Sequence, residues 1–126
     1  MAMRGLLAGL GLFGMVSAAA VTVQADRDGC WAAPDWCLQV EDSHWEGDRF
    51  AVRYRNVCEH RLYVKHCNQL KGGRWACEGG AIAPSLASTR DSHDATGSFH
   101  YRFVGSLEAS RDWVCADKES GWSRAP

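Results

Sequence analysis

Sequence motifs of common enzyme classes are missing from this chain. It contains no Gly-x-Ser-x-Gly, no His-Glu-x-x-His and no glycine-rich phosphate-binding loop, which are signatures of serine hydrolases, zinc proteases and nucleotide-binding enzymes. Ser92, His93 and Asp94 carry the side chains of a nucleophilic triad, but neighbours on a chain point apart, whereas triad residues must converge in space. The sequence therefore indicates no catalytic residue.

A long apolar pattern with helical spacing is also missing. Instead, apolar and polar side chains alternate in three segments, 50–55, 61–67 and 98–103. Because successive side chains on a strand point to opposite faces, this period of two predicts half-buried β-strands, with Leu62 and Val64 pointing inward. Shorter strands are predicted over 37–41, 74–77 and 113–116, and a short turn of helix over 106–111.

Glycine-rich segments separate these predicted strands. They predict turns at 46–48, 71–73 and 78–80, and the polar stretch 83–97 is predicted to be an irregular loop. Several short alternating strands joined by such turns favour an all-β fold, a small antiparallel β-sandwich or barrel stapled by up to three disulfides.

An excess of basic residues, which is typical of nucleic-acid-binding proteins, is missing as well. Of the 14 Lys and Arg residues, Arg4 alone precedes the first of the 15 Asp and Glu residues, and the charges that follow are nearly balanced. Nucleic-acid binders usually carry a basic patch. The sequence therefore predicts no nucleic-acid partner.

The N-terminal segment has the pattern of a secretory signal peptide. Arg4 is followed by apolar or small residues over 6–23, and Val23-Gln24-Ala25 resembles a cleavage site. We expect residues 1–25 to be removed, with cleavage after Ala20 as the second choice, leaving 26–126 as a single disulfide-stapled β domain. A retained membrane anchor is the alternative. Cleavage predicts a periplasmic or secreted protein without stable membrane insertion.

The cysteines agree with export. All six lie after the predicted cleavage site: Cys30, Cys37, Cys58, Cys67, Cys77 and Cys115. An even number in a short exported chain predicts a disulfide framework, whereas zinc sites usually show cysteine pairs two to four residues apart. Six cysteines allow 15 pairings. The short loop between Cys30 and Cys37 makes that pair the preferred one, followed by Cys67 with Cys77 across a hairpin, which leaves Cys58 for Cys115.

Tryptophan is the most informative excess. Six are present, and Trp75 and Trp113, each two residues before a cysteine, are expected in the core. Trp31, Trp36 and Trp45 lie in polar, loop-like surroundings, and exposed aromatic clusters mark interaction sites. These three residues are the candidate interaction surface, and the alternative is that Trp31 and Trp36 cap the core.

Five histidines, His44, His60, His66, His93 and His100, are spread along the chain. We interpret them as surface residues that become charged below about pH 6.5, and we predict no metal site and no cofactor. The preferred function is a small exported, non-catalytic binding or interaction module whose partner is a protein or glycan outside the cytoplasm. A small secreted hydrolase-type enzyme and a structural cell-envelope component are the alternatives.

Overall fold

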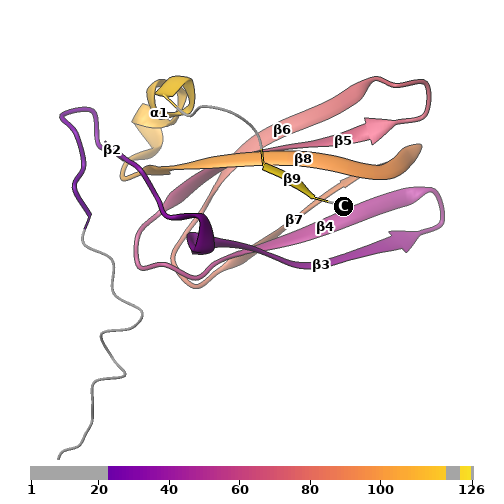
Figure 1. The fold of residues 1–126 in the computed structure, drawn as a ribbon, viewed down its shortest axis with the longest axis horizontal. Helices are drawn as coiled ribbons and strands as arrows, with labels where there is room; N and C mark the ends of the chain where they lie inside the picture. Colours follow the sequence, from indigo (N-terminus) through magenta and orange to yellow (C-terminus); the bar gives the residue numbers. More distant parts are fainter. Residues whose placement is uncertain (1–22, 119–122, 126) are drawn as a thin grey trace, which may run out of the picture.

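The computed structural model describes residues 23–118 and 123–125, and two antiparallel β-sheets face one another in it (Figure 1). One sheet has the strand order β2-β8-β5-β6 with β9 beside β8, and the other has the order β3-β4-β7. The first comprises β2 (Cys30–Trp31), β5 (Leu62–Leu70), β6 (Trp75–Ile82), β8 (Ala95–Ser106) and β9 (Ser123–Ala125); the second comprises β3 (Leu38–Glu46), β4 (Arg49–Asn56) and β7 (Ala87–Ser92). The predicted all-β, sandwich-like fold is confirmed. The predicted signal peptide lies outside the described residues, apart from its last three positions.

The alternating segments place their apolar side chains between the sheets, as the period of two predicts. The buried core comes mainly from three strands and includes Phe50, Val52, Tyr54, Leu62, Val64, Phe99 and Phe103. The intervening residues of β4 face outward, where Arg53 and Arg55 both pair with Glu41 of β3. The core therefore lies between β4 of one sheet and β5 and β8 of the other.

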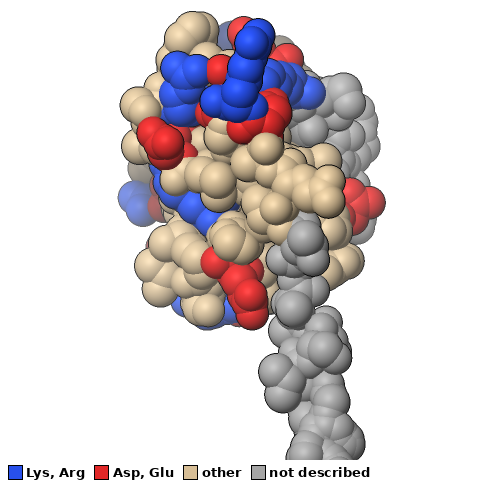
Figure 2. Space-filling view, turned by 90° about the vertical axis from the view of Figure 1, so that its left-hand side faces the viewer, with Lys and Arg blue, Asp and Glu red and all other residues tan. Residues whose placement is uncertain are grey.

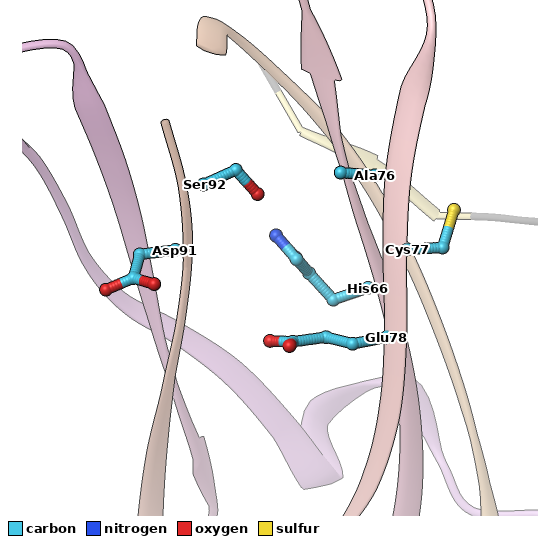
Figure 3. Close-up of a pocket in the computed structure, with 6 residues that line it drawn as sticks. All are labelled: His66, Ala76, Cys77, Glu78, Asp91 and Ser92. Atoms are coloured by element: carbon cyan, nitrogen blue, oxygen red, sulfur yellow. The ribbon is translucent and has the colours of Figure 1, made fainter. Parts of the chain in front are cut away.

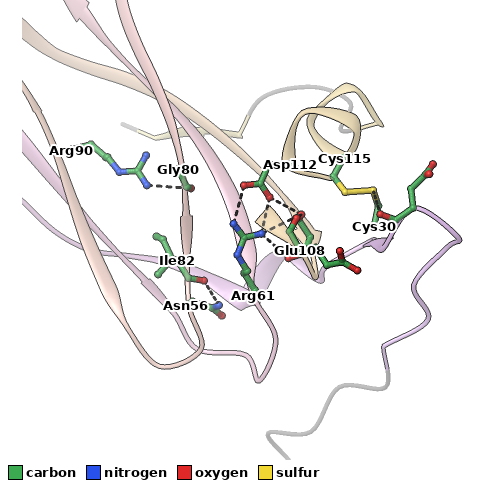
Figure 4. Close-up of polar contacts among 11 residues, drawn as sticks. Cys30, Asn56, Arg61, Gly80, Ile82, Arg90, Glu108, Asp112 and Cys115 are labelled. Carbon is green, nitrogen blue, oxygen red and sulfur yellow. Dashed lines mark hydrogen bonds and ion pairs between the residues drawn. A yellow bond between two sulfur atoms is a disulfide. The ribbon is translucent and has the colours of Figure 1, made fainter. Parts of the chain in front are cut away.

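The segment 113–116 is helical, so the predicted strand there is wrong. A 3-10 helix, η4 (Ala109–Arg111), leads into α1 (Asp112–Lys118), and another 3-10 helix, η3 (Asp35–Cys37), precedes β3. Asp112 receives two hydrogen bonds from Arg61, of 2.7 and 2.9 Å (Figure 4). This bidentate pair holds the start of α1 beside the segment that leads into β5. Trp113 of α1 points to solvent, with 70% of its surface exposed. No helix within the described ranges is long and apolar enough to cross a membrane.

The segment 83–97, predicted as a loop, contains strand β7 and the start of β8. The prediction failed because β7 turns Arg90, rather than an apolar residue, toward the interior, where it is 6% exposed. The predicted turn at 78–80 is wrong for a related reason. Gly79 and Gly80 lie within β6, where a Cβ atom would meet the hydroxyl of Tyr63 at 2.2 Å and the guanidinium of Arg90 at 3.3 Å, respectively. Each glycine makes room for a large side chain.

All six cysteines form disulfides, but the preferred pairing of Cys30 with Cys37 is wrong. Cys30 is joined to Cys115 and Cys37 to Cys58. Trp31 pairs with Gly105 of β8, which commits Cys30 to the five-stranded sheet beside α1, whereas Cys37 leads into the other sheet. The remaining pair, Cys67 with Cys77, is the predicted one and joins directly opposed residues of β5 and β6. Three intramolecular disulfides indicate an oxidising, extracytoplasmic environment.

The end of the molecule that carries α1 and β2 shows charges of both signs side by side (Figure 2). Lys118 contacts Asp26 and Asp28 at 2.6 and 3.0 Å, and Arg111 also pairs with Asp28. These pairs lower the pKa of both aspartates and raise that of Lys118. The basic side chains of Lys118 and Arg111 on this face therefore have acidic partners beside them.

Candidate functional site

A small cleft opens between the sheets on the side where β6 and β7 form their edges. It has a volume of about 220 Å³. Six residues of β5, β6 and β7 line what we call the β6–β7 cleft: His66, Ala76, Cys77, Glu78, Asp91 and Ser92 (Figure 3). This volume is below the range of about 300–1,000 Å³ of drug-sized ligand sites, so the cleft suits a small molecule or the end of a larger one.

His66 forms the floor of the cleft and is only 1% exposed. Its Nδ1 atom lies 2.5 Å from the hydroxyl oxygen of Tyr54, which is fully buried. Burial raises the pKa of Tyr54 far above its usual value, so the phenol keeps its hydrogen. The phenol therefore donates its hydrogen to Nδ1, which acts as the acceptor. The ring hydrogen of neutral His66 is then on Nε2.

The Nε2 atom of His66 has no hydrogen-bond partner. Burial lowers the pKa of the ring to about 4. The neighbouring Asn68 side chain, whose Oδ1 atom lies outside hydrogen-bond geometry, opposes this shift, and the positive charge of Arg90 adds to it. His66 is therefore neutral at physiological pH. A buried donor without a partner costs free energy, and here it belongs to a residue that lines an open cleft.

Two further unpartnered atoms lie beside His66. Asn68 donates from Nδ2 to the Ser92 hydroxyl at 3.1 Å, but its Oδ1 atom is buried without a partner. Arg90 donates to Ser88 Oγ at 3.2 Å and to the carbonyl of Gly80 at 3.4 Å (Figure 4), but its Nη1 atom has none. Polar atoms at this depth are normally satisfied by protein or by an ordered water molecule. Their concentration in one place marks a region that stability alone does not explain.

Polar and acidic groups complete the walls of the cleft. The Ser92 hydroxyl and the His66 ring point toward one another, and the Glu78 side chain lies below them (Figure 3). The carboxylate of Asp91 turns away and contacts Arg49 at 3.4 Å. The cleft therefore offers an imidazole donor and a hydroxyl inside, with the Glu78 carboxylate beside them.

The arrangement is suited to binding and poorly suited to acid–base chemistry. A general base should have a pKa near the working pH, whereas the pKa of His66 is about 4. Its Nδ1 atom is held by a phenol rather than by the carboxylate of a serine hydrolase triad. In the described part of the chain, no group of three His, Cys, Asp or Glu side chains is placed to hold a metal ion.

The three tryptophans of the predicted interaction surface do not form one cluster. Trp31 is 4% exposed and packs edge-on against His60 with ring centres 5.8 Å apart. Trp36 and Trp45 are 44% and 49% exposed, but Trp36 lies in η3, before the start of β3, and Trp45 lies near the end of β3. The predicted Cys30–Cys37 disulfide, which would close the short loop that contains Trp31 and Trp36, is absent because both cysteines pair elsewhere. Whether Trp36 or Trp45 binds a partner stays a prediction.

Sequence reasoning missed the residues of the cleft, although one signal was available. His66 has the same parity as Leu62 and Val64, both predicted to point inward, so the interpretation of His66 as a surface residue is wrong. Asn68 continues the same row and is also buried. An inward-facing strand position that holds a polar residue is a sign of a site or a polar network.

Comparison of the chain with models of protein families, with curated proteins and with solved structures finds no match in any of the three.

Proposed function

We propose that the protein is an exported, non-catalytic binding module that holds a small polar ligand in the β6–β7 cleft. The observation that carries the proposal is His66, which is almost fully buried, lines an open cleft and has an Nε2 atom without a hydrogen-bond partner. A ligand with an acceptor oxygen, such as a carbonyl or hydroxyl group, supplies the missing partner. The gain is large at such a position because a buried unsatisfied group costs about 1–3 kcal/mol.

The rest of the molecule suits this role. Disulfides join η3 to the segment after β4, β2 to α1, and β5 to β6, so they restrict the framework around the cleft. A site that is already formed loses little entropy on binding. We also propose that residues 1–25 act as a cleaved signal peptide and that the domain works in the periplasm or outside the cell. The disulfides support this destination.

Titration of the purified domain with small probes, followed by NMR of the histidine rings, tests the binding proposal. Suitable probes are acetate, acetamide, glycerol, glucose and glycine, which differ in charge and in acceptor groups. We expect at least one to shift the ring signals of His66 in a saturable manner, while those of His44, exposed on β3, stay unchanged. If no probe moves the His66 signals, or all histidines move together, the cleft is not a binding site.

A small hydrolase is the second candidate, because Ser92 and His66 face one another across the cleft. No hydrogen bond joins Ser92 to His66, and the Ser92 hydroxyl instead accepts one from Asn68. A fluorophosphonate, which labels activated serines, separates the two functions. A binding module leaves Ser92 unlabelled, whereas stoichiometric labelling of Ser92 that is lost in Ser92→Ala establishes the hydrolase instead.

A further inference from the structure

The three disulfides differ in their access to solvent. Cys30, Cys115, Cys37 and Cys58 are each at most 4% exposed. In the third disulfide, Cys67 is 5% exposed but Cys77 belongs to the exposed residues of β6. The Cys77 sulfur points away from the β6–β7 cleft, toward the outer face of the sheet (Figure 3). Cys77 is therefore the one exposed cysteine of the six, and its disulfide is the one that a thiol in solution reaches most readily.

The surroundings of Cys67 and Cys77 form a second, open depression. It has a volume of about 320 Å³ and is lined by both cysteines, Trp75 and His100. The rings of Trp75 and His100 meet edge to face with centres 4.3 Å apart, and His100 is the register partner of Cys67 on β8. The disulfide thus lies on the floor of a depression with an aromatic wall, which offers space for an attacking molecule.

The charges nearby favour a thiolate. Lys65 and Arg102 are register partners on β5 and β8. They lie on the same face as Cys67 and His100, two register positions away. Positive charges stabilise thiolate anions, both an attacking one and the one that leaves. The leaving sulfur of Cys67 therefore lies on the face of the sheet that carries these two basic residues.

Loss of this disulfide is tolerable for the fold. Cys67 and Cys77 are only 10 residues apart, whereas the other pairs close separations of 21 and 85 residues. A short closed loop restricts the unfolded chain least. In addition, β5 and β6 remain paired from Leu62 opposite Ile82 to Gln69 opposite Trp75. The ladder holds the hairpin together when the covalent bond is broken.

We propose that Cys67–Cys77 is a thiol–disulfide exchange site, with Cys77 as the sulfur that is attacked. A thiolate forms a bond to Cys77 Sγ, the Cys67–Cys77 bond breaks, and its electron pair leaves on Cys67 Sγ, which takes a proton from water. A second thiolate then attacks the reductant's sulfur in the mixed disulfide, and Cys77 Sγ leaves with the electron pair and takes a proton from water. The protein gains two thiols and the two reductant thiols become one disulfide. This inference is independent of ligand binding in the β6–β7 cleft.

Timed reduction of the native protein tests the site. One arm uses reduced glutathione, and the other uses a catalytic amount of a dithiol oxidoreductase with its recycling system. Alkylation and peptide mapping then identify the free cysteines. We expect Cys67 and Cys77 to appear about tenfold faster than the other four in at least one arm, because reaction requires access. Selectivity in the first arm alone identifies a small thiol as sufficient, and selectivity in the second alone identifies a protein thiol.

Equal rates for the three disulfides, earlier reduction of a buried pair, or no reduction in either arm overturns the proposal. Two single variants check which sulfur is attacked: Cys67→Ser leaves a thiol at Cys77, and Cys77→Ser leaves one at Cys67. We expect the Cys77 thiol to react with a maleimide about tenfold faster than the Cys67 thiol. Equal reactivity contradicts the assignment.

A double variant checks that the fold tolerates loss of this disulfide. Cys67→Ser/Cys77→Ser should keep the β-sheet circular dichroism of the native protein, and Cys37→Ser/Cys58→Ser is the matched variant. If either double variant fails to fold, selective reduction of the native protein decides whether the proposal holds.

Discussion

The two sides of the sandwich interior differ in what they bury. Between β4 and β8 the interior is apolar, with side chains such as Phe50 and Phe99, whose ring centres lie 6.0 Å apart. Toward β6 and β7 it holds His66, Asn68 and Arg90, each with an unpartnered atom. Apolar burial stabilises a fold, whereas unsatisfied polar burial opposes it. The first side therefore explains why the domain is stable, and the second is where a function is to be sought.

The largest effect is expected at Trp31 of β2, which packs in the apolar core although its indole Nε1 atom has no hydrogen-bond partner. Its ring lies against Gly105, where an added Cβ atom would meet it at 2.2 Å. Trp31→Ala should lower the free energy of unfolding by about 3–5 kcal/mol, as other core aromatic truncations do. Trp36→Ala, at an exposed position of η3, is the matched control and should change it by about 0.5 kcal/mol or less. Urea unfolding measures both, and equal losses would show that the two rings are buried to the same extent.

A pH effect of intermediate size is expected from the polar side. The pKa of His66 falls from 6.5 to about 4 in the folded protein, so between these values the unfolded chain binds more protons. The contribution of neutral His66 to the free energy of unfolding is therefore fully present above pH 6.5. It is lost as the pH drops toward 4. The loss between pH 7.5 and 4.5 should be about 2–3 kcal/mol.

His66→Gln removes the titrating ring and should flatten unfolding curves measured across this pH range. His44 affects the pH dependence of stability in the opposite direction, because Glu46 and Asp42 raise its pKa. His44→Gln should therefore keep the full loss on acidification. An unchanged pH profile in His66→Gln would show that His66 does not control it.

A smaller effect is expected for the Tyr54–His66 hydrogen bond. Tyr54→Phe removes the phenol and leaves His66 Nδ1 buried without a partner, which should cost about 1–3 kcal/mol. Tyr54→Phe/His66→Leu replaces both partners with apolar groups and should recover most of that loss. Thermal unfolding of the two variants is the measurement. A double variant that is less stable than the single one would mean that His66 stabilises the fold rather than serving a ligand.

The same comparison explains what was predictable from the sequence. The alternation of apolar and polar residues predicted β4, most of β5 and the central half of β8. β7 was missed because its inward positions are polar, and the glycines of β6 were read as a turn because their large neighbours, Tyr63 and Arg90, come from other strands. Local patterns cannot reveal such long-range partners.

Two of the disulfide pairings escaped prediction for the same reason. The partner of Cys30 is 85 residues away, and only the pairing of β2 with β8 and the docking of α1 bring the two together. The Cys67–Cys77 pair was predictable because a hairpin is local. The cleft could not be predicted because residues of three separate strands line it. The position of His66, in the same inward-facing row as Leu62 and Val64, was the one signal of it in the sequence.

The most direct test of the binding proposal fills the β6–β7 cleft without touching its polar groups. Ala76 lines the cleft, whereas Ala81, on the same strand, pairs with Tyr63 on the opposite face. Ala76→Leu occupies the space, and Ala81→Leu adds the same atoms outside it. With the probe that shifts His66, calorimetric titration should show affinity reduced at least about tenfold in Ala76→Leu and unchanged in Ala81→Leu, since an occluded ligand loses its contacts. Equal affinity of the two folded variants would contradict binding in the cleft.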